Sequence, residues 1–363
     1  MSNNPLRLAV VGAGTFGSKC LEALQTVQGV QVVAVGDWDA GVAEKAGRSF
    51  GIPFFTDHRQ LFSQAKPAAV LIATPPSEAP DLIRFASRSG VHVLKPAPLA
   101  RTLDEAVDLV STMRAAKLRF GILSPRRFSP GYRHLIIGRE ALGPLSLGRA
   151  QYVLNWGGQF GWRGDHATAG GGVLLEAGYE MLDLLVWAMG LPEVVFAIAG
   201  RHGRPYMLES GGEVQPLGIY DTDDTALVAL RYASGTFGSV VTSWVTSPPV
   251  EQIMLHGQLG SMVAEPDGCV MRDANGQAIS QTQSDPRALA GLCRELSELV
   301  QAFQTDSRLY ESSALEHLLT MAVVEAAYLS DRTGQPESPR TLLKARNFTP
   351  EECSAARPMV IRE

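Results

Sequence analysis

The sequence predicts an α/β fold, in which a doubly wound parallel sheet is followed by a second α/β unit with a largely antiparallel, open sheet. Three observations support this prediction. A short apolar strand runs directly into a glycine-rich turn at residues 12–17, apolar strands and helices then alternate up to residue 123, and strand-like runs separated by turns follow. Because 363 residues exceed one ordinary hydrophobic core, we expect two domains, at residues 1–123 and 124–363.

The first strand, turn and helix have the order that dinucleotide binding requires. Residues 8–11 are the strand, residues 18–26 are the helix, and the turn reads Gly12-Ala13-Gly14-Thr15-Phe16-Gly17. Gly12 permits a tight turn, Gly14 lets the backbone approach a pyrophosphate, and Gly17 lets helix and strand pack closely. The free N–H groups at the helix start then face the phosphates. We expect Thr15 and Phe16 to contact the cofactor together with the three glycines.

An acidic residue, Asp37, ends the second strand at residues 31–36, about 20 residues beyond the last glycine. A carboxylate there accepts hydrogen bonds from the ribose hydroxyls and repels a 2′-phosphate. The expected cofactor is therefore NAD, and NADP is disfavoured. Trp38 follows and is expected to flank the adenine. The alternative for Asp37 is a turn or cap acid, because Asp39 and Gly41 also mark a turn.

The α/β alternation continues to residue 123, with helices expected at 43–50, 59–64, 81–89 and 102–117 and strands at 54–55, 68–73, 92–94 and 119–123. The run at 68–73 is apolar throughout, as a strand buried on both faces requires. Thr102 and Glu105 form a predicted capping box. Ligands of such sheets bind at the carboxyl ends of the strands, so five residues there are expected at the cofactor: Thr74, Pro75, Pro76, Lys95 and Pro96.

The pattern changes after residue 124. Strand-like runs occupy residues 149–155, 194–199, 225–232, 237–243 and 252–255. The helix predicted at 172–189 is apolar nearly all round, so we expect it to be buried between layers. Two amphipathic helices are predicted at 289–305 and 312–332.

Composition excludes several classes of protein. A net charge of −5 provides no basic field for nucleic acid or an anionic membrane surface. No apolar run is long enough for a membrane span, and the first seven residues do not resemble a secretory signal. The four cysteines form no Cys-x-x-Cys pair, which favours a reduced, cytoplasmic protein.

Residues 170–183 carry the most specific motif. Six positions match the pattern Gly-Gly-Gly-x-Leu-x-Asp-x-Gly-x-His-x-x-Asp, with Glu176 at the place of its first Asp and Glu180 at the place of its His. On this motif the chain resembles the glucose–fructose oxidoreductase / inositol dehydrogenase (Gfo/Idh/MocA) family. The resemblance implies an NAD(P)-binding Rossmann domain and a second α/β domain. It also implies hydride transfer to or from a sugar or polyol, and dimers or tetramers formed through the open sheet.

Two shorter motifs follow the order of the same family. Lys95-Pro96 resembles its Glu-Lys-Pro motif, with Leu94 in place of the glutamate, and the resemblance implies that the lysine lies near the nicotinamide and the substrate hydroxyl. The run 126–128, Arg-Arg-Phe, resembles an Asn/Gln-x-Arg-Phe segment whose polar place is taken by Pro125.

Glu176, Glu180 and Asp183 have the spacing i, i+4, i+7, which places them on one face of a helix. We expect Glu176 and Glu180 to be catalytic beside Lys95, and Asp183 to bind substrate. A glutamate base needs a pKa raised by burial or by another carboxylate, and Lys95 would oppose the rise. Two roles stay open: Glu180 is the base, or it accepts substrate hydrogen bonds while Lys95 is the base. Three acids without a histidine at ligand spacing give no expected metal site.

An aromatic and polar loop precedes the three glycines. Trp162, Arg163 and His166 are expected to bind substrate, because aromatic faces with charged groups suit sugar rings. His166 could also supply an acid or base, and its alternative is an ordinary surface histidine.

The sequence thus predicts an NAD-dependent oxidoreductase that acts on a CH–OH group of a sugar, inositol-like polyol or derivative, as a homodimer or homotetramer. Two alternatives remain. One is a non-redox NAD-binding sensor or regulator, and the other is a hydrolase or lyase that uses bound NAD transiently.

Overall fold

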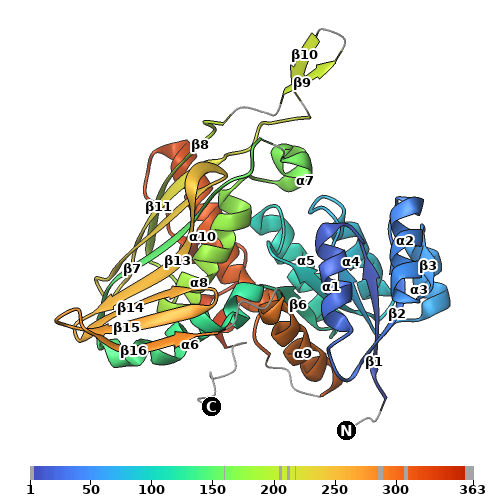
Figure 1. Cartoon of the computed structure of the whole chain (residues 1–363), viewed down its shortest axis with the longest axis horizontal. Coiled ribbons are helices and arrows are strands. Elements are labelled where there is room, and N and C mark those ends of the chain that lie inside the picture. Colours follow the sequence, from blue (N-terminus) through green and yellow to red (C-terminus); the bar gives the residue numbers. More distant parts are fainter. Residues whose placement is uncertain are drawn as a thin grey trace.

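The computed structural model describes residues 4–158, 160–203, 207–210, 213–216, 218–284, 289–305 and 310–355. Its two main sheets lie side by side, with helices between and around them (Figure 1). The first is a six-stranded parallel sheet of order β3-β2-β1-β4-β5-β6, which confirms the predicted doubly wound topology. Its strands are β1 (Leu6–Val11), β2 (Val30–Gly36), β3 (Phe54–Phe55), β4 (Ala69–Ile72), β5 (His92–Pro96) and β6 (Phe120–Leu123).

The helices of this domain are α1 (Thr15–Leu24), α2 (Ala40–Phe50), α3 (His58–Ala65), α4 (Ala79–Arg88) and α5 (Leu103–Ala115). Helix α1 begins directly after Gly14, three residues earlier than predicted, so Thr15 and Phe16 belong to its first turn. Thr102 caps α5 by accepting a hydrogen bond from the Glu105 backbone N–H at 3.2 Å. The predicted capping box is only half formed, because the Glu105 carboxylate accepts from the backbone N–H of Arg101 instead.

The second sheet has eight strands in the order β16-β15-β14-β13-β7-β12-β11-β8, and every pair is antiparallel except β7 with β12. The strands are β7 (Leu145–Asn155), β8 (Val194–Gly200), β11 (Thr225–Arg231), β12 (Phe237–Ser243), β13 (Val245–Gly257), β14 (Gly260–Glu265), β15 (Gly268–Asp273) and β16 (Ala278–Gln283). Strands β14, β15 and β16 were not predicted. A separate ribbon of β9 (Met207–Ser210) and β10 (Glu213–Pro216) stands away from both sheets (Figure 1).

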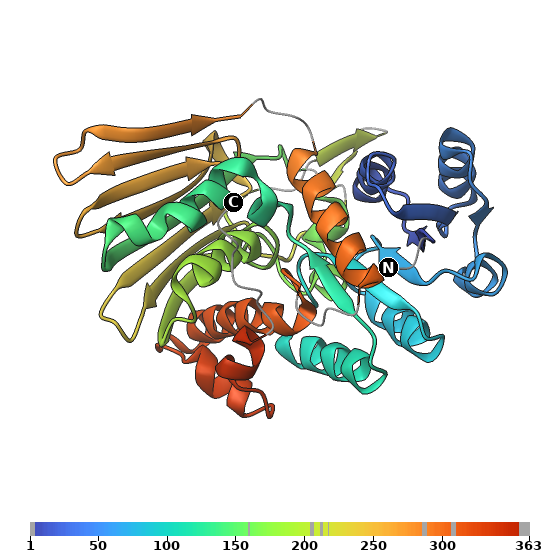
Figure 2. The same ribbon diagram turned by 90° about the horizontal axis from the view of Figure 1, so that it is seen from below.

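One face of the second sheet is covered by α8 (Tyr179–Met189) and α10 (Ala314–Thr333), as Figure 2 shows. The strands alternate accordingly: Val195 and Val228 are buried, whereas Ile198, Leu227 and Phe237 on the other face are exposed. The remaining helices are α6 (Pro130–Gly138), α7 (His166–Ala169), α11 (Pro339–Lys344), α12 (Pro350–Ser354) and short 3₁₀ segments at Pro125–Phe128, Arg139–Leu142 and Gly161–Gly164. No helix covers the other face within the described residues, and exposed apolar side chains lie there beside exposed polar ones such as Arg149 and Arg231.

Helix α9 (Ala290–Gln304) follows the second sheet in the chain but packs on the first one. Its apolar residues share a buried cluster with strands of the first sheet; the members from α9 are Leu292, Leu296, Leu299, Val300 and Phe303, and those from the strands include Leu8, Val10, Leu71 and Leu94. The boundary at residue 123 thus separates the two sheets in sequence, while the first core takes one helix from beyond it.

The described residues contain neither a helix suited to a membrane nor a cluster of metal ligands. None of their helices is long and apolar enough to cross a membrane. None of their His, Cys, Asp and Glu side chains form a group of three that could hold a metal ion.

Candidate active site

The turn between β1 and α1 has the geometry that a bound pyrophosphate needs. Gly12 has φ +90°, and a Cβ there would lie 2.7 Å from the Ala73 backbone. A Cβ on Gly17 would lie 1.9 Å from the Gly12 carbonyl oxygen, so close packing excludes a side chain. A Cβ on Gly14, by contrast, would meet nothing within 4 Å. The backbone at Gly14 is therefore open to a ligand in front of the free N–H groups of α1.

Asp37 lies beside this turn and partly fixes it. One carboxylate oxygen accepts from the Ala13 backbone N–H at 2.8 Å, and the other from the Asp39 N–H at 3.0 Å. The turn role considered for Asp37 is thus present, and each oxygen keeps a lone pair for a ribose hydroxyl.

A small hollow brings the expected nucleotide residues together. Its lining includes Gly12, Asp37, Trp38 and Thr74. The Thr74 hydroxyl is buried and lacks a hydrogen-bond partner among the described residues, which is unusual for a buried polar atom unless a ligand or water satisfies it. Trp38 is exposed, and its indole N–H donates to Glu78 at 2.9 Å. The open Gly14, the oriented Asp37 and the unpartnered Thr74 together fit NAD.

Lys95, at the end of β5, is only 3% exposed. Its ammonium donates to two backbone carbonyls, of Pro96 at 3.0 Å and of Pro98 at 2.6 Å. Burial lowers the pKa of Lys95 to about 8, although nearby Glu105 opposes the shift. Neither Glu176 nor Glu180 is among the groups that perturb it. The ammonium therefore ties down the chain after β5, and the expected opposition of Lys95 to the glutamates is wrong.

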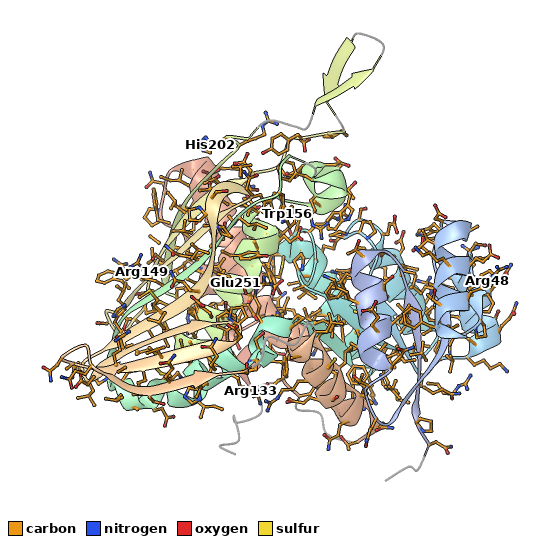
Figure 3. All side chains as sticks on the ribbon, in the orientation of Figure 1. Arg48, Arg133, Arg149, Trp156, His202 and Glu251 are labelled. Carbon is orange, nitrogen blue, oxygen red and sulfur yellow. The ribbon has the colours of Figure 1, made fainter. Side chains whose placement is uncertain are left out.

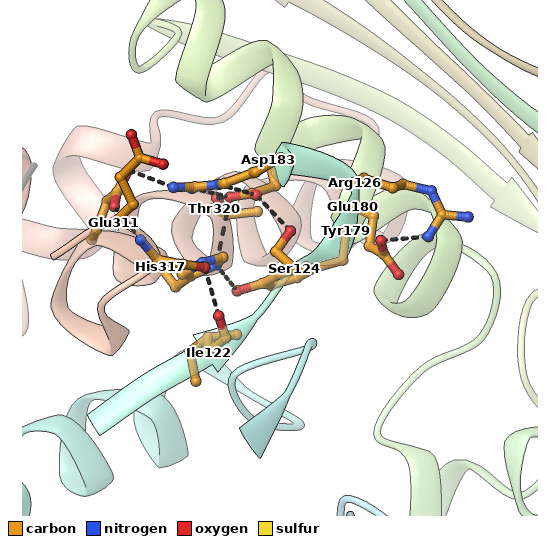
Figure 4. Close-up of polar contacts among 12 residues, drawn as sticks. Ile122, Ser124, Arg126, Tyr179, Glu180, Asp183, Glu311, His317 and Thr320 are labelled. Atoms are coloured by element: carbon orange, nitrogen blue, oxygen red, sulfur yellow. Dashed lines mark hydrogen bonds and ion pairs between the residues drawn. The ribbon is translucent and has the colours of Figure 1, made fainter. Parts of the chain in front are cut away.

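The segment with the three glycines is not one regular helix. Leu174–Gly178 is a π-helical turn, in which the Gly178 N–H donates to the Val173 carbonyl at 2.8 Å, and α8 follows it. A π turn takes more residues than an α turn, so the i, i+4, i+7 rule does not apply across it. Glu180 and Asp183 both lie on α8 beyond this turn, and Figure 4 shows that they have different partners: Glu180 meets Arg126, whereas Asp183 belongs to a buried group with Ser124 and Thr320.

Asp183 is completely buried, which contradicts its expected contact with substrate. Its carboxylate accepts two hydrogen bonds of 2.6 Å from Arg127, one of 2.8 Å from Thr320 and one of 3.1 Å from Ser124. Arg127 also pairs with Glu316 at 2.8 Å. These charge-assisted hydrogen bonds hold the pKa of Asp183 well below its usual range despite burial. Asp183 joins α8 to the end of β6 and to α10, and it is structural.

Glu180 is partly accessible, with 18% of its side chain exposed. Burial raises its pKa, and the facing cation that opposes the rise is Arg126. Arg126 Nη1 donates to Glu180 Oε2, while Nε and Nη2 donate to the two oxygens of Glu251 at 3.0 and 3.2 Å. Tyr132 donates its hydroxyl to Glu251 at 3.1 Å, and the Arg126 guanidinium lies 4.5 Å from the centre of the Tyr152 ring.

Glu176 has a different arginine. Arg163 Nε donates to both Glu176 oxygens at 2.6 Å, and the guanidinium lies 4.2 Å from the Trp162 ring and 5.4 Å from the Trp156 ring. Burial raises the pKa of Glu176, and Arg163 opposes the rise. In Figure 3, Trp156 and Glu251 lie on the side of the second sheet that faces the first domain. Glu176 and Glu180 thus lie in one region. Each is paired with an arginine that also makes a cation–π contact with an aromatic ring.

Trp162 and Arg163 belong to this region, but His166 has no contact with either glutamate. It begins α7 and is exposed; its backbone N–H donates to Asp221 at 2.7 Å, and its carbonyl accepts from the Gly170 N–H at 2.7 Å. The surface alternative considered for His166 agrees with this position.

Contacts tie the glutamates to the carboxyl ends of β5 and β6. Ser124 directly follows β6 and bonds Asp183, one turn from Glu180. Arg101, in the chain after β5, donates to the Ala167 carbonyl at 3.0 Å, just before the glycines. Ligands of open α/β sheets bind at this edge.

Comparison with known proteins agrees with the geometry. A family model described as "Oxidoreductase family, NAD-binding Rossmann fold" matches residues 6–123, and one described as "GFO/IDH/MocA C-terminal domain" matches residues 134–263. The chain belongs to the Gfo/Idh/MocA oxidoreductase family. Its first domain is therefore an NAD-binding Rossmann domain of this family, as the sequence predicted.

Characterised relatives of the Gfo/Idh/MocA family are similar over most of the chain. Levoglucosan dehydrogenase from Pseudarthrobacter phenanthrenivorans is 25% identical over 264 residues, covering 68% of this chain and 67% of the relative. scyllo-Inositol 2-dehydrogenase (NAD(+)) from Bacillus subtilis is 27% identical over 250 residues, covering 67% and 68%. The same fold occurs in an oxidoreductase from Agrobacterium radiobacter solved with NAD+, L-tartaric acid and magnesium, with a TM-score of 0.80, 20% identity, and coverage of 94% and 100%.

In the motif described above, Glu180 occupies the place of a histidine. Sequence reasoning identified both glutamates but missed the residues that control Glu180, namely Tyr132, Tyr152 and Glu251, and it noted Arg126 only as part of a motif. Glu251 lies on a strand of the second sheet, 125 residues from Arg126 in the chain. The contact between Arg126 and Glu251 could therefore not be predicted from residue spacing.

Proposed function

We propose that this protein is an NAD-dependent oxidoreductase that oxidises a CH–OH group of a sugar, inositol-like polyol or derivative, or reduces the corresponding carbonyl, with Glu180 as the general base. The observation that carries the proposal is the position of Glu180. It is a partly accessible carboxylate with a raised pKa, near the edge of the sheet where the open Gly14 and Asp37 lie. The dehydrogenase relatives support the same reaction class.

Bound NAD supplies the hydride acceptor, and the chain supplies the proton acceptor and the positioning groups. Glu180 Oε2 is held by Arg126, whereas Oε1 has no hydrogen-bond partner among the described residues. The hydroxyl proton of the substrate would pass to Oε1 as the hydride leaves the same carbon. Glu176, Arg163 and Trp162 offer an acceptor, donors and an aromatic face to the other hydroxyls.

The role of Lys95 follows from its contacts. Because its ammonium is buried on two backbone carbonyls, we assign the base function to Glu180 and a supporting function to Lys95. Asp37 supports NAD over NADP, since a carboxylate at this position repels a 2′-phosphate.

Turnover tests the proposal directly. With NAD and a broad panel of sugars, sugar acids and polyols, we expect NADH formation with at least one compound. Glu180→Gln should lower kcat by a factor on the order of 10²–10⁴ and leave the Kd for NAD unchanged. The control is Glu193→Gln, at an exposed site away from the cluster. No turnover with any compound in either direction, or a fully active Glu180→Gln variant, would refute the assignment.

A second candidate function is a non-redox NAD-binding sensor. It is favoured by one observation, that contacts within the protein occupy the Lys95 ammonium and one of the two oxygens of Glu180. This candidate predicts NAD binding by calorimetry with no isotope exchange between NADH and any added carbonyl or alcohol. Measurable exchange eliminates it.

We also propose self-association through the outer face of the second sheet and a reducing, cytoplasmic location. The exposed apolar residues of that face support the first, because exposed apolar patches mark interfaces; they include Phe196, Ile198, Leu227 and Phe237. The four cysteines, all unpaired, support the second. Leu227→Lys should reduce the mass measured by light scattering to that of a monomer, and an unchanged mass would place the interface elsewhere.

A further inference from the structure

The side chains around Glu180 form a linear series in which each member orients the next. Tyr132, fully buried on α6, donates to Glu251 on β13. Glu251 receives two hydrogen bonds from Arg126, and Arg126 uses its remaining terminal nitrogen for Glu180. The ring of Tyr152, on β7, makes a cation–π contact with the Arg126 guanidinium. We name Tyr132, Glu251, Arg126 and Glu180 the acid–arginine series.

The bidentate contact decides the orientation of Arg126. A guanidinium held by two parallel N–H bonds to a carboxylate has little freedom to rotate, so its third contact is directed. Arg126 Nη1 therefore meets Glu180 Oε2 and leaves Oε1 free. A histidine at position 180 would need no such cation, because its own neutral ring accepts a proton near neutral pH.

We propose that Arg126 is a positioning residue that enables Glu180 to act in the place of the family's histidine: held by Glu251, it orients the Glu180 carboxylate and balances its charge. This inference rests on the proposed function. It explains why the glutamate occurs beside this arginine, since an ionised Glu180 without a facing cation would be unfavourable in this partly buried region.

Several charged groups face Glu180 and set its titration. Arg126 favours the ionised form, whereas Glu251 and Glu176 disfavour it together with burial. Buried Glu295 on α9 also interacts electrostatically with Glu180. Removing Arg126 leaves burial and negative neighbours alone, so the pKa of Glu180 must rise further. The ionised form then requires a higher pH.

A double-variant cycle tests the proposal. In the native background, Arg126→Gln should lower kcat about tenfold or more and move the rising limb of the kcat/KM profile to higher pH by about one unit or more, without changing the Kd for NAD. In the Glu180→His background the same change should raise kcat, because Arg126 opposes the imidazolium that forms when histidine takes the proton. The sign of the effect thus depends on residue 180.

Controls separate positioning from folding. Arg133→Gln removes another half-buried arginine that pairs with a glutamate, Glu311 at 2.7 Å, and should leave the pH profile in place. Arg126→Lys keeps the positive charge but lacks the paired N–H donors of the guanidinium. This variant should therefore retain part of the activity that Arg126→Gln loses. If Arg126→Gln does not fold, Glu251→Gln serves instead, since it loosens Arg126 and should give a smaller shift in the same direction.

Two outcomes overturn the inference: an equal loss of activity from Arg126→Gln in both backgrounds, or an unmoved pH profile. If the protein showed no turnover, the proposed function would be refuted, but the effect of Arg126 on the ionisation of Glu180 could still be measured. Isotope-edited infrared spectra, referenced to Glu180→Gln, then follow the carboxyl directly. We expect Arg126→Gln to protonate Glu180 at higher pH than the native protein does, and identical titrations would contradict the proposal.

Discussion

At the scale of single residues, burial separates acids that look equivalent in the sequence. Asp183 has no exposed surface and four hydrogen bonds from three side chains, whereas Glu180 is partly accessible and leaves one oxygen unbound. Asp183 is therefore one partner of a buried ion pair, whereas Glu180 has a free oxygen that a substrate hydroxyl could reach. Their spacing in the chain predicted one shared face, but their partners come from different elements.

Asp183→Asn should destabilise the protein by about 3–5 kcal/mol at pH 7, because it leaves the charge of Arg127 buried without its main partner. The depressed pKa of Asp183 stabilises the native state above pH 4, and this contribution is lost as the pH falls further. Urea unfolding at pH 7 measures the first effect, and its comparison with unfolding at pH 3 measures the second. The control is Asp81→Asn, whose carboxylate is 96% exposed and should change little. Equal effects of the two variants would contradict the structural role.

Lys95→Met should reveal the cost of a buried ammonium. The pKa of Lys95 is about 8 in the folded protein against an ordinary value of 10.5, so the unfolded chain binds more protons between these values. Native stability should therefore rise from pH 8 to pH 10.5, by roughly 3 kcal/mol, and the methionine variant should lack this rise. Denaturant unfolding across that range gives the difference, and parallel curves for both proteins would show that the ammonium is not destabilised.

At the scale of elements, the glycines of the first turn have different tasks. The lack of any neighbour at Gly14 and the contact of 1.9 Å at Gly17 separate ligand access from packing. The π turn before α8 is another local feature of the site, since it interrupts regular helical spacing between Glu176 and Glu180. The glycine spacing predicted the tasks of Gly14 and Gly17, whereas the π turn could not be predicted from residue spacing alone.

Gly14→Ala and Gly17→Ala should fail in different ways. Gly14 has φ −64°, which alanine adopts freely, so Gly14→Ala should fold normally but weaken NAD binding about tenfold or more, because the methyl group occupies the space a pyrophosphate needs. Gly17→Ala should instead lower the free energy of unfolding by about 3 kcal/mol through overlap with the Gly12 carbonyl. Calorimetry and thermal unfolding of both variants distinguish the effects; normal NAD affinity in Gly14→Ala would exclude close backbone approach there.

At the scale of the whole molecule, the two sheets are not independent units. Helix α9 buries Leu296 and Leu299 against strands of the first sheet, although it follows the second sheet in the chain. A fragment of residues 1–123 would expose that apolar face to water. The arrangement also fixes β6 relative to α8, through Ser124 and Asp183.

Residues 1–123 produced alone should therefore lack a cooperative thermal transition and bind a hydrophobic dye, while the full chain unfolds cooperatively. Leu296→Ala in the full chain should cost about 2–5 kcal/mol, because Leu296 is completely buried between α9 and the sheet. Near-ultraviolet circular dichroism and dye fluorescence measure the first effect. A fragment with a sharp transition would show that α9 is dispensable for the first core.

The sequence by itself determined the parallel sheet, the glycine turn, Asp37 and most strands of the second sheet, because apolar periodicity and turn residues act over short distances along the chain. It did not reveal β14, β15 and β16, whose short runs are partly polar. The tertiary structure alone decided which acids are exposed and which cations they meet. Glu180 meets Arg126 from 54 residues away, and Arg126 meets Glu251 from 125 residues away. The ionisation and orientation of a carboxylate depend on such neighbours in space, which spacing in the chain does not encode.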